Sequence, residues 1–63
     1  MMTQDQVLLG AAMMLLKQHG THAPLKVAER LGELATTGDE DGMAAWMGIA
    51  RHMSSILHAA SEH

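Results

Sequence analysis

The sequence predicts an all-α protein, a three-helix bundle with short connections, and three observations support this. The chain has 63 residues, of which 48% are apolar, yet Phe, Tyr and Cys are absent, Trp occurs once and Met seven times. Leu, Met and Ala favour helices, whereas the aromatic and β-branched residues that favour strands are scarce. Gly20 and Gly38 divide the chain into three segments. Within each segment, apolar residues recur at the three- and four-residue steps of a helix.

The first helix is expected over about residues 3–19. Thr3 followed by Gln6 is a capping-box pattern, in which each side chain accepts a hydrogen bond from a backbone amide of the other residue. Gly20 suits the position after the helix end, because glycine adopts positive φ angles without strain. The run from Val7 to Leu16 is apolar almost throughout, so apolar side chains occupy every sector of this helix.

The second helix is expected over about residues 24–37. Pro24 fits a first helical turn, where its missing amide proton has no partner within the helix, and Gly38 marks the end of the helix. The apolar face that we predict for this helix contains Leu25, Ala28, Leu31, Leu34 and Ala35.

The third helix is expected over about residues 39–60, with Asp39 as its N-cap. Glu40 and Asp41 would place negative charge beside the positive end of the helix dipole. Its apolar seam is predicted to contain Met43, Trp46, Ala50, Met53, Leu57 and Ala60, flanked by Ile49 and Ile56. Trp46 is expected to be largely buried, and the short connections predict that neighbouring helices run antiparallel.

Three glycines lie inside the expected helices, where glycine costs about 1 kcal/mol relative to alanine. They are Gly10, Gly32 and Gly48. We expect each of them to lie where two helix backbones approach closely.

The small size of the chain predicts a partner. Residues 1–63 have room for one domain, which buries only roughly 60% of the surface of its unfolded chain. Without cysteine there are no disulfides to add stability. We therefore expect a homodimeric helical bundle, or docking on another protein, through an apolar surface that contains Leu9, Met13, Met14, Leu16, Met47 and Met53.

Charge and hydropathy make nucleic acid and membranes poor candidates for the partner. The net charge is −3, and the four Lys and Arg residues are dispersed. A helix-turn-helix reading would place Asp39, Glu40 and Asp41 against DNA, so a small DNA-binding regulator remains only as an alternative. The ten-residue apolar run is too short to span a membrane, which needs about 20 residues. We expect a cytoplasmic protein.

No motif predicts a catalytic, metal-binding or cofactor-binding residue. Asp39, Asp41 and Gly42 fit part of a calcium loop, but its first carboxylate and its bidentate glutamate are missing. Residues Ser55, His58 and Glu62 would share one helix face in the order of a nucleophilic triad, near the chain end with little to enclose them. His58 and Glu62 also have metal-ligand spacing, but no third ligand is evident. A minimal enzyme or a metal-binding protein is thus a further alternative.

A longer pattern consists of Ala28-Glu29-Arg30-Leu31-Gly32, Leu34-Ala35, Gly38-Asp39, Gly42, Trp46 and Ile49, preceded by His19-Gly20 and Ala23-Pro24. This pattern resembles small uncharacterised alphaproteobacterial three-helix proteins that share a domain of unknown function. The resemblance covers roughly residues 5–53 and implies no activity, because the pattern is structural in character. The sequence departs from the family at Ala11 and Leu16, where the relatives have polar side chains. The function that the sequence favours is a non-enzymatic interaction or oligomerisation module.

Overall fold

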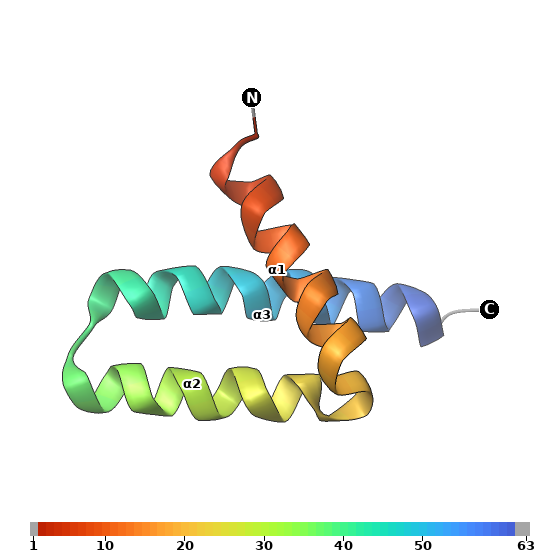
Figure 1. Ribbon diagram of the computed structural model, residues 1–63. Coiled ribbons are helices and arrows are strands. Elements are labelled where there is room, and N and C mark those ends of the chain that lie inside the picture. The colour runs from red at the N-terminus through yellow and green to blue at the C-terminus, as the bar shows by residue number, and fades with distance from the viewer. Residues whose placement is uncertain (1, 62–63) are drawn as a thin grey trace.

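The computed structural model describes residues 2–61, which form three α-helices and one short 3₁₀ turn. In chain order these are α1 (Gln4–His19), η1 (Gly20–His22), α2 (Ala23–Thr37) and α3 (Glu40–Ser61), as Figure 1 shows. Within residues 2–61 there is no strand, and the predicted all-α class is confirmed. Each helix begins and ends within one residue of the position expected from the sequence.

The start of α1 is held by the capping box that the sequence predicts. The Gln6 backbone amide donates to Thr3 Oγ1 at 3.1 Å, and the Thr3 amide donates to Gln6 Oε1 at 2.9 Å. Two amides that have no partner inside the helix are therefore satisfied. At the other end of α1, Gly20 has a φ of 57°, which a residue with a side chain rarely adopts.

The turn between α2 and α3 is short because two residues complete both helix ends. Gly38 is left-handed, with φ 75° and ψ 23°, and its amide donates to the Ala35 carbonyl at 3.2 Å. The Asp39 amide donates to the Leu34 carbonyl at 3.0 Å, and Asp39 Oδ1 accepts from the Gly42 amide at 2.9 Å. A turn this tight lays α2 and α3 antiparallel.

The Asp39 cap provides a first test of the local structure. Asp39→Ala is expected to lower the free energy of unfolding by about 1 kcal/mol, because the Gly42 amide loses its acceptor. Urea denaturation followed by circular dichroism measures this change. Asp41→Ala is the matched control, since it removes a carboxylate from the same helical turn but leaves the cap intact. Equal losses in the two variants would show that charge near the helix dipole, and not the cap, is what matters.

The first helix does not lie alongside the other two. Figure 1 shows α2 and α3 side by side, with α1 crossing them at a steep angle. Helix α1 packs mainly on α3, and its contacts with α2 are fewer. The expectation that neighbouring helices run antiparallel therefore holds for α2 and α3 but is wrong for α1. The reason is local, since Gly20 and the 3₁₀ turn redirect the chain before α2 begins.

The core lies where the three helices meet. Its buried cluster contains Ala12, Ala23, Val27, Ile49 and Met53. The side chains of Leu8, Ala11, Leu15, Leu16, Leu31, Trp46, Ala50 and Ile56 are partly buried against this cluster. Trp46, which the sequence predicts to be largely buried, is partly buried at the edge of this cluster.

Two further expectations about core faces are corrected by the structure. Helix α2 turns Ala23, Val27 and Leu34 inward, whereas Leu25 is exposed. The predicted face of α2 is therefore correct for Leu31 and Leu34 but wrong for Leu25, Ala28 and Ala35, because this helix carries two apolar stripes and periodicity alone does not select between them. The end of the α3 seam is exposed at Leu57 and Ala60, because α3 continues beyond the region that α1 and α2 cover.

Only one of the three mid-helix glycines lies at a crossing within the chain. A Cβ atom at Gly48 would lie 2.6 Å from Leu8 Cδ1, so this glycine allows α1 to approach α3. At Gly10 and Gly32 a Cβ atom would meet nothing within 4 Å. Inside the chain, the expected close approach is therefore found at Gly48 and not at Gly10 or Gly32.

Candidate interaction surface

The crossing of α1 over the hairpin leaves one side of that helix uncovered. We call this side the α1 outer face and define it by Val7, Leu9, Gly10, Met13 and Met14, all of which are exposed. Met13 is 58% exposed and Met14 is 55% exposed, values that are high for large apolar side chains. The opposite side of the helix packs on the core through Leu8, Ala12 and Leu15.

The structure changes the interface that the sequence predicts. Leu9, Met13, Met14 and Met47 are exposed, as a contact surface requires. Met53 is only 2% exposed and belongs to the core, so it cannot contact a partner unless the fold opens. Leu16 is partly buried against the same core. Met53 therefore lies in the core and not on the surface, and Leu16 is only partly available to a partner, because the buried sector of α1 widens at its C-terminal end.

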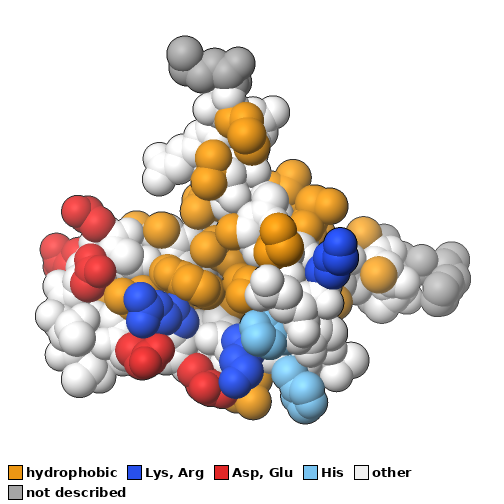
Figure 2. Space-filling view, in the orientation of Figure 1, with side chains coloured by type: hydrophobic (Ala, Val, Ile, Leu, Met, Phe, Trp, Pro, Cys, Tyr) orange, Lys and Arg blue, Asp and Glu red, His pale blue; other side chains and the backbone are white. Residues whose placement is uncertain are grey.

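The α1 outer face carries no charge. From Gln6 to Leu16 the sequence contains no ionisable residue. Figure 2 shows hydrophobic side chains gathered on α1 and at its crossing, while a group of Asp and Glu side chains lies at one end of the molecule. Asp39, Glu40 and Asp41 are at that end, at the start of α3. Their negative charge is favourable there because the N-terminus is the positive end of the helix dipole. Lys17 is the first charged residue after the apolar run.

A hydrogen bond between distant residues fixes the N-terminal half of α1 on α3. His52 Nε2 and Asp5 Oδ1 are 2.8 Å apart, although the two residues are separated by 47 positions in the sequence. Asp5 is mostly exposed and His52 is partly buried, so the bond contributes little energy but restricts the position of α1. Sequence reasoning missed this pair, because no local pattern relates residues so far apart.

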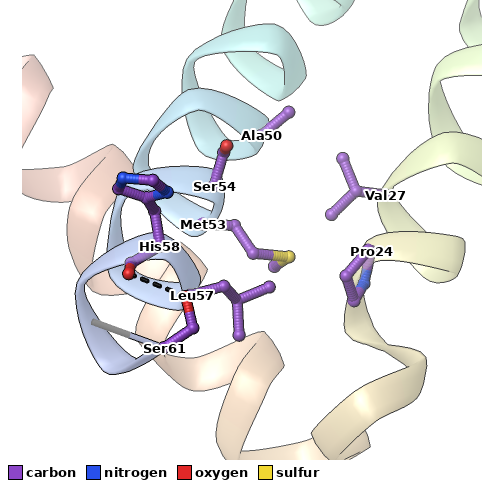
Figure 3. A pocket seen from close by; sticks show the side chains of 8 residues that line it. All are labelled: Pro24, Val27, Ala50, Met53, Ser54, Leu57, His58 and Ser61. Carbon is purple, nitrogen blue, oxygen red and sulfur yellow. Dashed lines mark hydrogen bonds between the residues drawn. The ribbon is translucent and has the colours of Figure 1, made fainter. Parts of the chain in front are cut away.

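A second feature is a groove between the start of α2 and the C-terminal half of α3, with a volume of about 450 Å³. Figure 3 shows its lining, which is Pro24, Val27, Ala50, Met53, Ser54, Leu57, His58 and Ser61. The apolar residues form most of its walls, and the Ser61 hydroxyl donates to the His58 backbone carbonyl at 2.9 Å. The sequence pattern contained a signal for this groove, since Ala50, Met53 and Leu57 share a stripe on α3.

Of the nucleophilic-triad candidates that the structure describes, Ser55 and His58, only His58 lines this groove. His58 lines it, but Ser54 and not Ser55 shares the lining with His58. Glu62 lies outside the described residues. The part of the chain from residue 2 to residue 61 contains no group of three or more His, Asp or Glu side chains that could hold a metal ion. None of the helices in that part is long and apolar enough to cross a membrane.

Comparison with known proteins places the chain among proteins without an assigned activity. No curated protein and no solved structure matches it. The model of a family of unknown function, DUF6961, matches residues 4–61, which include α1, α2 and α3. This match covers more of the chain than the resemblance seen in the sequence pattern. The chain therefore belongs to this family of unknown function, DUF6961.

Proposed function

We propose that this chain is a non-enzymatic, cytoplasmic protein–protein interaction module whose docking surface is the α1 outer face. One observation carries the proposal, namely that large apolar side chains remain exposed together on an uncharged helix face. Folded monomers rarely leave a contiguous apolar patch of more than a few hundred Å² in water. Methionine also suits such a surface, because its flexible and polarisable side chain adapts to the shape of a partner.

The energetic gain from covering this face is substantial for a chain of this size. Complete burial of a Leu or Met side chain contributes about 1.5–3 kcal/mol. Val7, Leu9, Met13 and Met14 are between roughly one third and two thirds exposed, so covering them recovers part of that energy. A lone core below ~70 residues rarely supplies more than about 3–5 kcal/mol. A partner that binds only the folded chain would therefore add to its stability.

The charge distribution favours a protein partner over DNA. Asp39, Glu40 and Asp41 lie at the N-terminus of α3, the position from which a recognition helix contacts base edges. Three carboxylates there would repel phosphate. The DNA-binding alternative predicts retention on heparin at moderate salt, and the metal-binding alternative predicts a defined metal stoichiometry after dialysis.

A substitution on the α1 outer face tests the proposal. Met13→Glu is expected to reduce the yield of proteins captured by the immobilised chain from an extract of its native host at least about tenfold, because the charge would be buried at an apolar contact. Quantitative mass spectrometry of the captured proteins, including untagged copies of the chain itself, measures this loss. Circular dichroism checks that the variant remains helical.

Leu25→Glu is the matched control for this experiment. Leu25 is 56% exposed, almost the same as Met13, but it lies on α2 and outside the α1 outer face. We expect Leu25→Glu to capture the same proteins as the unmodified chain. If the two variants lose the same proteins to the same extent, the α1 outer face is not the docking surface.

A further inference from the structure

We propose that the partner on the α1 outer face is a second copy of this chain, and that the two α1 helices cross at Gly10. This inference rests on the proposed function and adds the identity of the partner and the point of contact. Three independent observations support it: the surface area of the chain, the absence of charge on the face, and the position of Gly10.

The first observation is that the folded chain exposes more surface than its mass requires. A compact monomer of 6.8 kDa exposes roughly 4,000 Å², whereas this chain exposes 4719 Å². Its radius of gyration is 12.0 Å, compared with about 10.6 Å for a compact domain of this length. A chain this open has surface available for an interface of standard size, to which each partner contributes ~800 Å².

The second observation is that no charged residue lies near Gly10 on this face, where the first one, Lys17, is seven positions away. In a two-fold dimer the same patch contributes both sides of the interface, so every charge on the patch would be brought near its own copy. From Gln6 to Leu16 there is no charge to repel. A surface adapted to a charged partner would instead carry complementary charges near its centre.

The third observation is the glycine at the middle of the face. Gly10 has Val7 three positions before it and Met13 and Met14 three and four positions after it, so these exposed side chains surround Gly10 on the helix surface. Apart from the adjoining backbone of α1, nothing in residues 2–61 lies within 4 Å of a Cβ placed at Gly10, so no contact among these residues requires glycine. Glycine at this position lowers helix stability. A close crossing with a second α1 explains why glycine is present here. In that crossing the Met and Val side chains of each copy pack around Gly10 of the other copy.

Sedimentation equilibrium from low to high micromolar concentration tests this arrangement. The unmodified chain is expected to form a dimer that dissociates on dilution. Gly10→Leu should raise the dimer Kd at least about tenfold, because the added side chain separates the two helices. Gly32→Leu is the matched control, since Gly32 is also an exposed mid-helix glycine with open space around it, and its Kd should not change.

Cysteine cross-linking gives a second measurement that does not depend on affinity. The chain has no native cysteine, so Gly10→Cys introduces the sole thiol. If two copies of Gly10 meet, their Cα atoms come within the ~7 Å that a disulfide can bridge, and mild oxidation yields a covalent dimer. Gly32→Cys should form no covalent dimer under the same conditions, because Gly32 lies on α2 and outside the proposed contact.

The outcomes separate the inference from the proposed function. In one outcome the chain remains monomeric at high micromolar concentration, while capture of a different protein still depends on Met13. This result would contradict a second copy as the partner but would support the α1 outer face as the docking surface. A Kd that falls or stays constant in Gly10→Leu would overturn the crossing at Gly10, because the added leucine would then only extend an apolar patch. Finally, the dimer Kd could be the same in Met13→Glu, Gly10→Leu and their control variants. This result would overturn self-association through α1.

Discussion

Met53→Ala is expected to lower the free energy of unfolding by about 2–5 kcal/mol, whereas Met47→Ala should change it by less than about 0.5 kcal/mol. The two methionines lie six positions apart on α3, but Met53 is 2% exposed and Met47 is 55% exposed. Truncation of Met53 removes apolar contacts with the rest of the core and leaves a cavity that the helices cannot fully close. Truncation of Met47 removes a side chain that is mostly in water already.

Urea denaturation of both variants at one protein concentration, followed by circular dichroism, measures this difference. Met53→Ala loses most of the stability that so small a core supplies, so it is expected to be largely unfolded in water at 37 °C. Met53→Leu keeps the variant folded and the core nearly filled, and should cost less than about 1.5 kcal/mol. Similar losses in Met53→Ala and Met47→Ala would mean that the core is not centred on Met53.

Gly48→Leu should destabilise the fold by about 1–3 kcal/mol relative to Gly32→Leu. Both substitutions replace a mid-helix glycine and gain similar helix propensity, but only at Gly48 would the new side chain meet another helix. A Cβ atom there lies 2.6 Å from Leu8 Cδ1, and a leucine side chain extends further into the crossing. Helix α1 would have to move away from α3, which also pulls on the hydrogen bond between Asp5 and His52.

Thermal unfolding of the two leucine variants measures this effect. In a domain of 60–100 residues, 1 kcal/mol corresponds to a shift of roughly 4–8 °C in Tm. We expect the Tm of Gly48→Leu to lie at least about 4–8 °C below the Tm of Gly32→Leu. Gly48→Ala tests a smaller intrusion into the same crossing. Its methyl group meets only the end of the flexible Leu8 side chain, which can move. If Gly48→Leu were as stable as Gly32→Leu, the close approach of α1 and α3 would be wrong.

The helix limits could be predicted because they depend on residues near one another in the chain. Thr3 and Gln6 satisfy amides within one turn, and Gly38 and Asp39 complete the end of α2 and the start of α3. These hydrogen bonds form wherever the flanking helices form, regardless of how the helices pack. The exposed apolar character of α1 could also be anticipated, because apolar side chains around a whole helix exceed what two neighbouring helices can cover.

The candidate interface could be predicted only in part, because exposure depends on the orientation of each helix. The sequence assigned Met53 and Leu16 to the interface, whereas Met53 is buried in the core and Leu16 is partly buried against it. Gly10 was expected where two helices approach closely, but inside the chain a Cβ atom at this position would have open space around it. Each error came from the same source, since a periodic pattern shows that a stripe exists and not which neighbour covers it.

By itself the sequence determined the helical class, the three segments and their ends, because propensity, capping and glycine conformation act over a few residues. Only the tertiary structure decided that α1 crosses the α2–α3 hairpin, that Val27 and not Leu25 faces the core, and that Asp5 meets His52. These features depend on how whole helices fit together, through contacts between residues far apart in the chain. Side-chain volumes at the crossing decide that fit, with Gly48 and Leu8 in contact and Ala12 buried beside them.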